Sequence, residues 1–95
     1  MRGRKKSFNK TVRKKIFEKY GWICANNNDP KCLYNKGLSI HHIIPNTEKN
    51  AKIYGDEFLQ SESNGILLCS FCHENVSTIS WIKTKKKELE KKYKK

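Results

Sequence analysis

Apolar residues near the N-terminus recur at every fourth position, which is the spacing of an amphipathic helix. The positions that follow this spacing are Phe8, Val12, Ile16 and Tyr20. Gly21 comes directly after them and fits a helix C-terminus. The pattern predicts a helix over residues 8–20, with the basic side chains Arg13 and Lys14 off its apolar face.

Two short runs of apolar and β-branched residues predict strands. The first covers residues 38–44 and ends at Pro45. The second covers residues 66–68 and follows the turn dipeptide Asn64-Gly65.

Residues 46–63 between the two predicted strands form a long polar connection whose role is left open. Residues 51–59 could form a short helix, although Gly55 weakens that prediction, and Tyr54, Phe58 and Leu59 suggest that the connection packs against the rest of the chain.

A second helical region is expected from Ser70, with Phe71, Ile79 and Ile82 among its apolar positions. Residues 83–95 continue at helical spacing, supported by Glu–Lys pairs four residues apart. Helices and strands of this kind in 95 residues predict one small α+β domain and exclude a multidomain enzyme.

Charge is concentrated at the two ends of the chain, whose formal net charge is +12. Residues 1–20 carry nine Lys or Arg against one Glu, and residues 83–95 carry eight Lys against two Glu. Such ends suit a polyanion, because each cation placed on a phosphate releases counterions. The plainer interpretation is a solvated surface that keeps the protein soluble. A membrane surface fits less well, since neither end has a wide apolar face.

The near-neutral centre holds every cysteine and histidine. No apolar segment follows the basic N-terminus, so we expect a reducing cytoplasmic location, where metal-binding thiolates are favoured over disulfides. Cys69-x2-Cys72 and the wider pair Cys24-x7-Cys32 together predict a four-thiolate Zn²⁺ site. The alternatives are buried free thiols or a redox pair at Cys69 and Cys72.

The histidines lie in two places. His41 and His42 are neighbours on the first predicted strand, so their side chains point to opposite faces and one ion is unlikely to bind both. His73 follows Cys72 at the start of the second helical region. For a single histidine, a structural role would be the better interpretation. Because all three histidines lie in only two places, on the first predicted strand and directly after Cys72, a purely structural role is less favoured here.

Two segments of the chain carry a family pattern: Leu-Ser-Ile-His-His-Ile-Ile-Pro at residues 38–45 and Asn-Gly-Ile-Leu-Leu-Cys-Ser-Phe-Cys-His at residues 64–73. They resemble the HNH endonuclease family, in particular its zinc-supported four-cysteine subgroup with the ββα-metal (His-Me finger) fold. Tyr-Gly-Trp-Ile-Cys at residues 20–24 also resembles that subgroup. The similarity covers roughly residues 12–82.

The resemblance implies a role for each matching residue. His41 and His73 would be ligands of a catalytic divalent ion (Mg²⁺, Mn²⁺, Ni²⁺ or Zn²⁺), His42 would be the general base, and Asn64 would hold the loop and orient His42. The ligands of the separate structural zinc would be Cys24, Cys32, Cys69 and Cys72. The implied reaction is hydrolysis of DNA phosphodiester bonds, by nicking or double-strand cleavage, leaving 5′-phosphate and 3′-hydroxyl ends.

The implied organisation is a single HNH nuclease domain over residues 1–95. It comprises a basic arm (1–7), a helix (8–20), a zinc-supported ββα-metal core (24–82) and a basic helical tail (83–95). Double-stranded DNA is the expected partner, a homodimer is left open, and a bacterial or phage-encoded protein fits. The expected DNA-binding residues are Arg2, Arg4, Lys5, Lys6, Arg13, Lys14, Lys83, Lys85, Lys86 and Lys87.

Three features depart from the family pattern. Many relatives carry a further histidine four residues after the position of His73, where this chain has Ser77. The first cysteine pair is wider than the usual Cys-x2-Cys, and residues 46–63 are longer than expected. The alternative function is a non-catalytic zinc module that binds nucleic acid, but such a module would need neither His42 nor Asn64.

Overall fold

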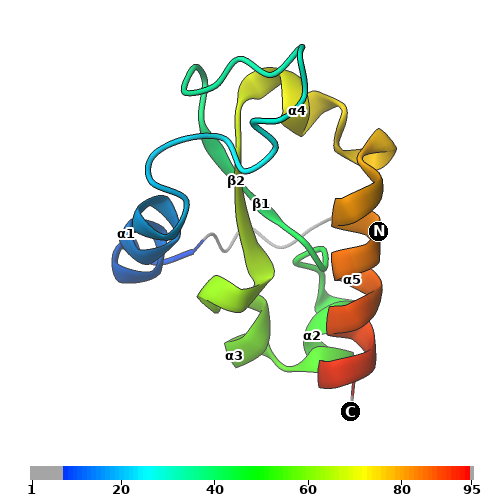
Figure 1. Cartoon of the computed structure of the whole chain (residues 1–95). Helices are drawn as coiled ribbons and strands as arrows, with labels where there is room; N and C mark the ends of the chain where they lie inside the picture. Colours follow the sequence, from blue (N-terminus) through cyan, green and yellow to red (C-terminus); the bar gives the residue numbers. More distant parts are fainter. Residues whose placement is uncertain (1–7, 95) are drawn as a thin grey trace.

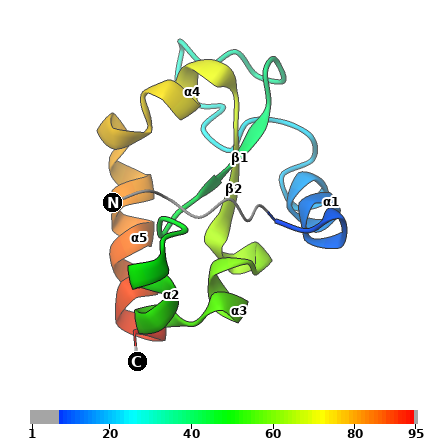
Figure 2. The same cartoon turned by 180° about the vertical axis from the view of Figure 1, so that it is seen from behind.

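Two short antiparallel strands lie at the centre of the molecule, with α1 on one side and α5 on the other (Figures 1 and 2). This computed structural model describes residues 8–94. Its elements are α1 Lys10–Lys19, β1 Ser39–His42, α2 Glu48–Tyr54, α3 Asp56–Leu59, η1 Glu62–Asn64, β2 Gly65–Leu68, α4 Ser70–Glu74, η2 Val76–Thr78 and α5 Ser80–Tyr93. The small α+β class expected from the sequence is confirmed.

The strand pairing fixes which residues share an end of this two-stranded ribbon. Ser39 pairs with Leu68 at one end, and His42 pairs with Gly65 at the other. All four residues of β2 are buried, whereas those of β1 are half-buried. β1 covers only the middle of the predicted run 38–44, because the ladder to β2 ends at His42.

The two faces of the ribbon belong to two apolar clusters, since successive side chains of a strand point to opposite sides. On the α1 side, Leu67 packs with Phe8 and Ile16. On the other side, Ile66 and Leu68 join the larger core. Its other buried aliphatic and aromatic members are Ile43, Ile44, Tyr54, Phe58, Leu59, Ile79, Ile82 and Leu89.

Helix α1 confirms the N-terminal stripe but begins two residues later than expected. Asn9 caps it, because its side-chain oxygen accepts a hydrogen bond from the Val12 N–H at 2.9 Å. Phe8 therefore precedes the helix, yet it is buried against β2. The helix ends before Gly21, which has a φ of +66°.

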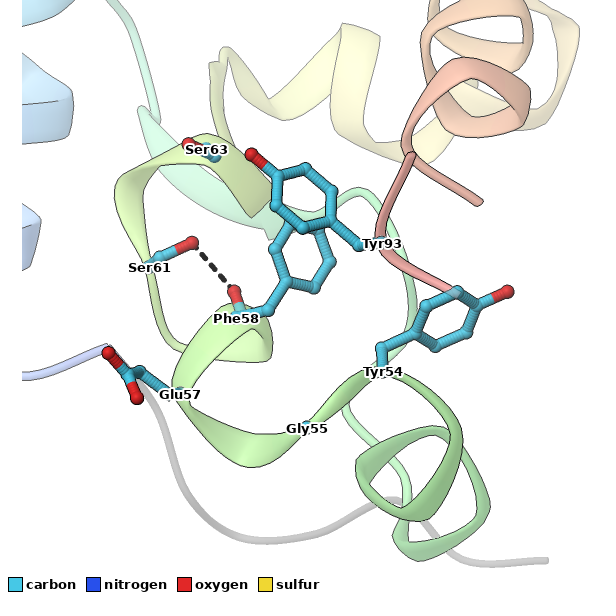
Figure 3. A pocket seen from close by; sticks show the side chains of 7 residues that line it. All are labelled: Tyr54, Gly55, Glu57, Phe58, Ser61, Ser63 and Tyr93. Atoms are coloured by element: carbon cyan, nitrogen blue, oxygen red, sulfur yellow. Dashed lines mark hydrogen bonds between the residues drawn. The ribbon is translucent and has the colours of Figure 1, made fainter. Parts of the chain in front are cut away.

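Residues 46–63, whose role the sequence left open, form part of the core. Gly55 has a φ of +90° and separates α2 from α3. Phe58 of α3 stacks on Tyr93 at the end of α5, with ring centroids 4.2 Å apart. Figure 3 shows these residues around a cavity of about 410 Å³, where the Ser61 hydroxyl donates to the Phe58 carbonyl at 2.7 Å.

The second helical region is divided rather than continuous. Asn75 ends α4, since its backbone and side-chain N–H groups both donate to the Phe71 carbonyl. The chain resumes as α5, which buries Ile82 and Leu89, so most of the basic C-terminal segment lies on a packed helix. None of the helices within residues 8–94 has the length and apolarity needed to cross a bilayer.

Candidate functional site: a four-cysteine cluster and a histidine pair

The four cysteine sulfurs gather beyond the Ser39–Leu68 end of the ribbon. All four lie within 4.8 Å of one another, and none of the cysteines is disulfide-bonded. The Sγ atoms of Cys32 and Cys69 are 3.8 Å apart. Sulfurs bound to one tetrahedral ion at about 2.3 Å would be separated by about 3.8 Å. The cluster can therefore hold a metal ion such as zinc.

Backbone geometry explains how a pair separated by seven residues forms one half of this cluster. The Cys24 N–H donates to the Tyr34 carbonyl at 2.8 Å, which closes the loop between the first two cysteines. The Ala25 N–H donates to the Leu67 carbonyl at 2.7 Å and docks this loop on β2. Tyr34 adopts a φ of +64°, and its N–H points at the Cys32 sulfur.

Each half of the cluster supplies N–H donors to its sulfurs. Cys24 accepts from the Asn26 N–H at 3.4 Å, and Cys32 accepts from the Tyr34 N–H at 3.3 Å. Cys69 accepts from the N–H groups of Leu33 and Cys72, at 3.3 and 3.4 Å. Hydrogen bonds of this kind favour thiolates, the form that binds metals.

The pKa values of the thiols show how readily each cysteine of the cluster ionises. Burial raises the pKa of Cys32 to about 11, and it raises that of Cys72 as well. Burial also acts against ionisation of Cys69, but the backbone N–H groups of Cys72 and Leu33 lower its pKa to about 7. Four neighbouring thiolates repel one another, so a cation is needed for all of them to ionise together.

Asn26 links this cluster to α5. Its side-chain amide donates to the Cys72 sulfur at 3.5 Å, and its oxygen accepts from the indole N–H of Trp81 at 2.8 Å. Asn26 is buried, so these contacts lie in a protected position. The N-terminal part of α5 is thereby tied to the residues that surround the sulfurs.

The structure brings two of the three histidines together. The rings of His41 on β1 and His73 on α4 lie edge to face, with centroids 5.5 Å apart. His41 is half-buried and His73 is exposed. Burial, followed by the nearby positive charges of His73, His42 and Lys86, lowers the pKa of His41 to about 4. His41 is consequently neutral at pH 7, as a metal ligand must be.

His42 lies apart from this pair, on the α1 face of the ribbon. Its ring stacks on Phe8 with centroids 4.0 Å apart, and its Nε2 hydrogen-bonds to the Gln60 side-chain oxygen at 3.2 Å. Burial lowers the pKa of His42, and the hydrogen bond to Gln60 opposes that effect in part. The opposite orientation of the two neighbouring histidines, expected from strand geometry, is confirmed.

Asn64 is fully buried and fastens the chain just after β1. Its side chain accepts from the Ile44 N–H at 2.8 Å and donates to the carbonyls of Ile44 and Leu59 at 3.0 and 3.1 Å. Its own carbonyl accepts from the Ile43 N–H at 2.9 Å. Asn64 thus holds the segment that follows His42, while the His42 ring itself hydrogen-bonds to Gln60.

The basic residues expected to bind DNA lie on two sides of the ribbon. Arg13 and Lys14 are exposed on α1. On α5, Lys83 and Lys87 are exposed, whereas Lys85 and Lys86 are partly buried. The remaining predicted positions, Arg2, Arg4, Lys5 and Lys6, lie outside the described residues. Because α1 and α5 flank opposite faces (Figure 1), these cations form two separate surfaces.

Several residues around these sites were missed in the sequence. Asn26 lies in a run of three asparagines, and nothing in that run distinguishes it. Gln60 and Phe8 contact His42 only because the chain folds back from both sides. One signal was available for α5, since Lys86 occupies a position of its apolar helical spacing.

Comparisons of the chain with protein-family models, with curated proteins and with solved structures found no match.

Proposed function

We propose that this protein is a metal-dependent endonuclease of the HNH type that hydrolyses DNA phosphodiester bonds. The observation that carries the proposal is the meeting of the His41 and His73 imidazoles, which come from different elements and lie outside the cysteine cluster. A cluster of four cysteines already provides a closed set of ligands. A second pair of metal-binding side chains therefore suits an open site, as catalytic metals require.

The two imidazoles fit a shared divalent ion. Rings bound to one ion through nitrogens at about 2.0–2.1 Å have centroids roughly 5 Å apart, and those of His41 and His73 are 5.5 Å apart. When bound there, Mg²⁺, Mn²⁺, Ni²⁺ or Zn²⁺ would neutralise charge on the phosphate and on the leaving 3′ oxygen. With only two protein ligands, the site would leave positions for water and substrate.

His42 is the proposed general base. Its lowered pKa keeps the ring neutral at pH 7, so it can accept a proton from water. Because Nε2 faces the Gln60 oxygen, Nε2 carries the hydrogen and Nδ1 is the nitrogen that accepts the proton. His42 is the last residue of β1. A DNA backbone that lies across this end of the strand would therefore reach both His41 on one face of the ribbon and His42 on the other.

The four cysteines are proposed to bind structural Zn²⁺. Sulfur ligands in a tetrahedral arrangement favour zinc among the common cellular metals. The ion would hold α4 in place, and with it His73, which directly follows Cys72.

A non-catalytic zinc module that binds nucleic acid is the second candidate. The observation that favours it is the engagement of the His42 ring by Phe8 and Gln60, away from His41 and His73. In that case the basic surfaces on α1 and α5 would bind DNA without cutting it.

The test is cleavage of supercoiled plasmid by the zinc-loaded protein with Mg²⁺, Mn²⁺ or Ni²⁺. EDTA should abolish nicking, and re-added Mg²⁺ should restore it while zinc content is monitored. His42→Ala should reduce the rate by roughly 10²–10⁴-fold, the usual contribution of a general base, with fold and DNA affinity retained. His41→Ala and His73→Ala should instead be partly rescued by excess metal.

The His42→Ala protein, purified identically, also controls for contaminating nuclease. If wild type and His42→Ala cut at the same rate, the mechanism is wrong. DNA binding without cleavage under every metal would favour the zinc module. Ser77→His adds the ligand that many relatives carry and should tighten binding of transition metals.

A further inference from the structure

A cavity of about 280 Å³ adjoins His41 on the α5 side of the ribbon. Residues from β1 and the segment after it, from η2 and from α5 line this cavity. They are His41, Ile43, Pro45, Val76, Ser77, Ile82, Lys83 and Lys86. No acidic residue is among the described residues that line it.

Lys86 has an unusual position on α5. The inward-facing residues of this helix follow a spacing of three and four, which places them on one stripe. The members of that stripe are Ile79, Ile82, Lys86, Leu89 and Tyr93. The four others are apolar or aromatic and are buried or half-buried, so Lys86 is the one cation among them.

Lys86 is partly buried in this stripe and lines the cavity beside His41. An apolar side chain at this position would complete the stripe. Lys83 lines the same cavity one helical turn earlier, so two cations face one space. Two cations and no carboxylate among the described residues of the lining favour binding of an anion. Because the cavity adjoins His41, a proposed metal ligand, a phosphate group of the DNA is the anion that fits.

We propose that Lys86, assisted by Lys83, forms the subsite that holds the scissile phosphate group beside His41. This inference rests on the proposed endonuclease function and assigns the substrate a definite place in it. Lys86 would bind a non-bridging phosphate oxygen while Ser77, at the cavity wall, provides a hydroxyl. Lys85 and Lys87 of the same helix would bind flanking phosphates without selecting the bond that is cut.

The subsite can be tested without any cleavage assay. Inorganic phosphate is titrated into the zinc-loaded full chain, with chloride holding ionic strength constant, and backbone ¹H–¹⁵N spectra are followed. We expect shifts at Val76, Ser77 and Lys86. Lys86→Gln should weaken phosphate binding by about tenfold, the usual effect of losing one charged hydrogen bond.

Lys91→Gln is the matched control, because it removes the same charge from an exposed position of the same helix that is not among the expected DNA-binding residues. It should leave phosphate affinity nearly unchanged. Equal effects of the two variants would overturn the subsite. Lys86→Leu guards against misfolding of the glutamine variant, since it completes the apolar stripe. It should raise Tm by several degrees and still lose phosphate binding, whereas retained binding would contradict the proposal.

The plasmid assay separates this inference from the function on which it rests. Phosphate binding that depends on Lys86, in a protein that cuts no DNA, would leave the anion site standing and reject the endonuclease. Cleavage with unchanged KM and kcat in Lys86→Gln would reject the subsite and leave the endonuclease standing. In a functional subsite, Lys86→Gln should lower kcat/KM by at least about tenfold, while Lys91→Gln should change it far less.

Discussion

The two ends of the central ribbon are organised in opposite ways. At the Ser39–Leu68 end, four sulfurs lie within 4.8 Å of one another, and backbone N–H groups point at three of them. Toward the His42–Gly65 end, His41 meets one other imidazole, and His42 faces away from both. The first end has four side chains that could bind one metal ion, and the second has two facing imidazoles beside a cavity.

We infer from this difference that the cysteine end stabilises the fold and that the histidine end is the one suited to bind a ligand. A closed set of four thiolates leaves no position for substrate, so the cysteine end suits a structural ion. Two histidines leave positions vacant for water or phosphate, which a catalytic ion needs. The two ends are joined by α4, because Cys72 belongs to the first and His73, the next residue, belongs to the second.

The largest expected effect comes from breaking the cysteine end. Cys69→Ala removes the sulfur that accepts two backbone N–H groups, and we expect loss of bound metal and of cooperative folding. Zinc binding by small domains contributes about 10–16 kcal/mol, which equals or exceeds the whole stability of a typical domain. Metal analysis and thermal unfolding followed by circular dichroism measure both losses.

Ser70→Ala is the control for that substitution, because Ser70 is the next residue and is exposed. It should keep its metal and its Tm. A Cys69→Ala protein that is folded and free of metal would show that the cluster does not stabilise the fold.

Asn64→Ala should have the second-largest effect, and it tests whether the histidine end has its own anchor. The change leaves one N–H and two carbonyls without their side-chain partner in a buried place. We expect a loss of about 3 kcal/mol in the free energy of unfolding. Denaturant titration measures this loss, and metal content should stay that of the wild type.

Asn50→Ala provides the comparison, since Asn50 makes an exposed hydrogen bond to the Pro45 carbonyl of the same segment. It should cost less than about 1 kcal/mol. Equal losses in the two variants would mean that burial of Asn64 contributes nothing.

Trp81→Phe tests the link between the cysteine end and α5. It removes the indole N–H that donates to Asn26 while keeping an aromatic ring. We expect a loss of about 1 kcal/mol and faster release of metal to a chelator, because Asn26 also donates to Cys72. The chelator competition rate is the measurement. Trp22→Phe, at an exposed indole that lies tilted against the Phe17 ring, should leave that rate unchanged.

The smallest expected effect concerns pH and belongs to the histidine end. The pKa of His41 is about 4 in the folded protein, against an ordinary value of 6.5. Between these values the unfolded chain binds more protons, so stability falls as pH drops from 6.5 toward 4. We expect this residue to account for about 1 kcal/mol, less than the full shift because the ring is only half-buried.

His41→Phe should remove that contribution and leave a shallower decline of stability over the same pH range. Denaturant midpoints at pH 6.5 and pH 5, in buffer containing only the structural metal, measure the two slopes. Parallel slopes for wild type and variant would contradict the assignment to His41.

The sequence alone determined the elements whose pattern is local. The four-residue spacing predicted α1, and the β-branched runs on either side of the turn dipeptide predicted β1 and β2. It also indicated that Cys24, Cys32, Cys69 and Cys72 form one cluster, because they occur as two pairs in a small domain and such domains often depend on a metal or disulfides. Strand geometry alone predicted that His41 and His42 face opposite sides.

Other features depended on contacts between residues distant in the chain. The apolar residues within 46–63 indicated only that this polar connection packs against the rest of the chain. The contact of Phe58 with Tyr93 is one that no local pattern contains. The partners of His42 are Phe8 and Gln60, which reach it from opposite directions along the chain.

The apolar spacing did not predict the break between α4 and α5, because this spacing continues across it. It is the side chain of Asn75 bonding to the Phe71 carbonyl that ends α4. Periodicity thus fixed which residues turn inward, since it follows from backbone geometry alone. Only tertiary packing decided which of those residues meet, because burial and hydrogen bonding depend on the whole chain closing around the ribbon.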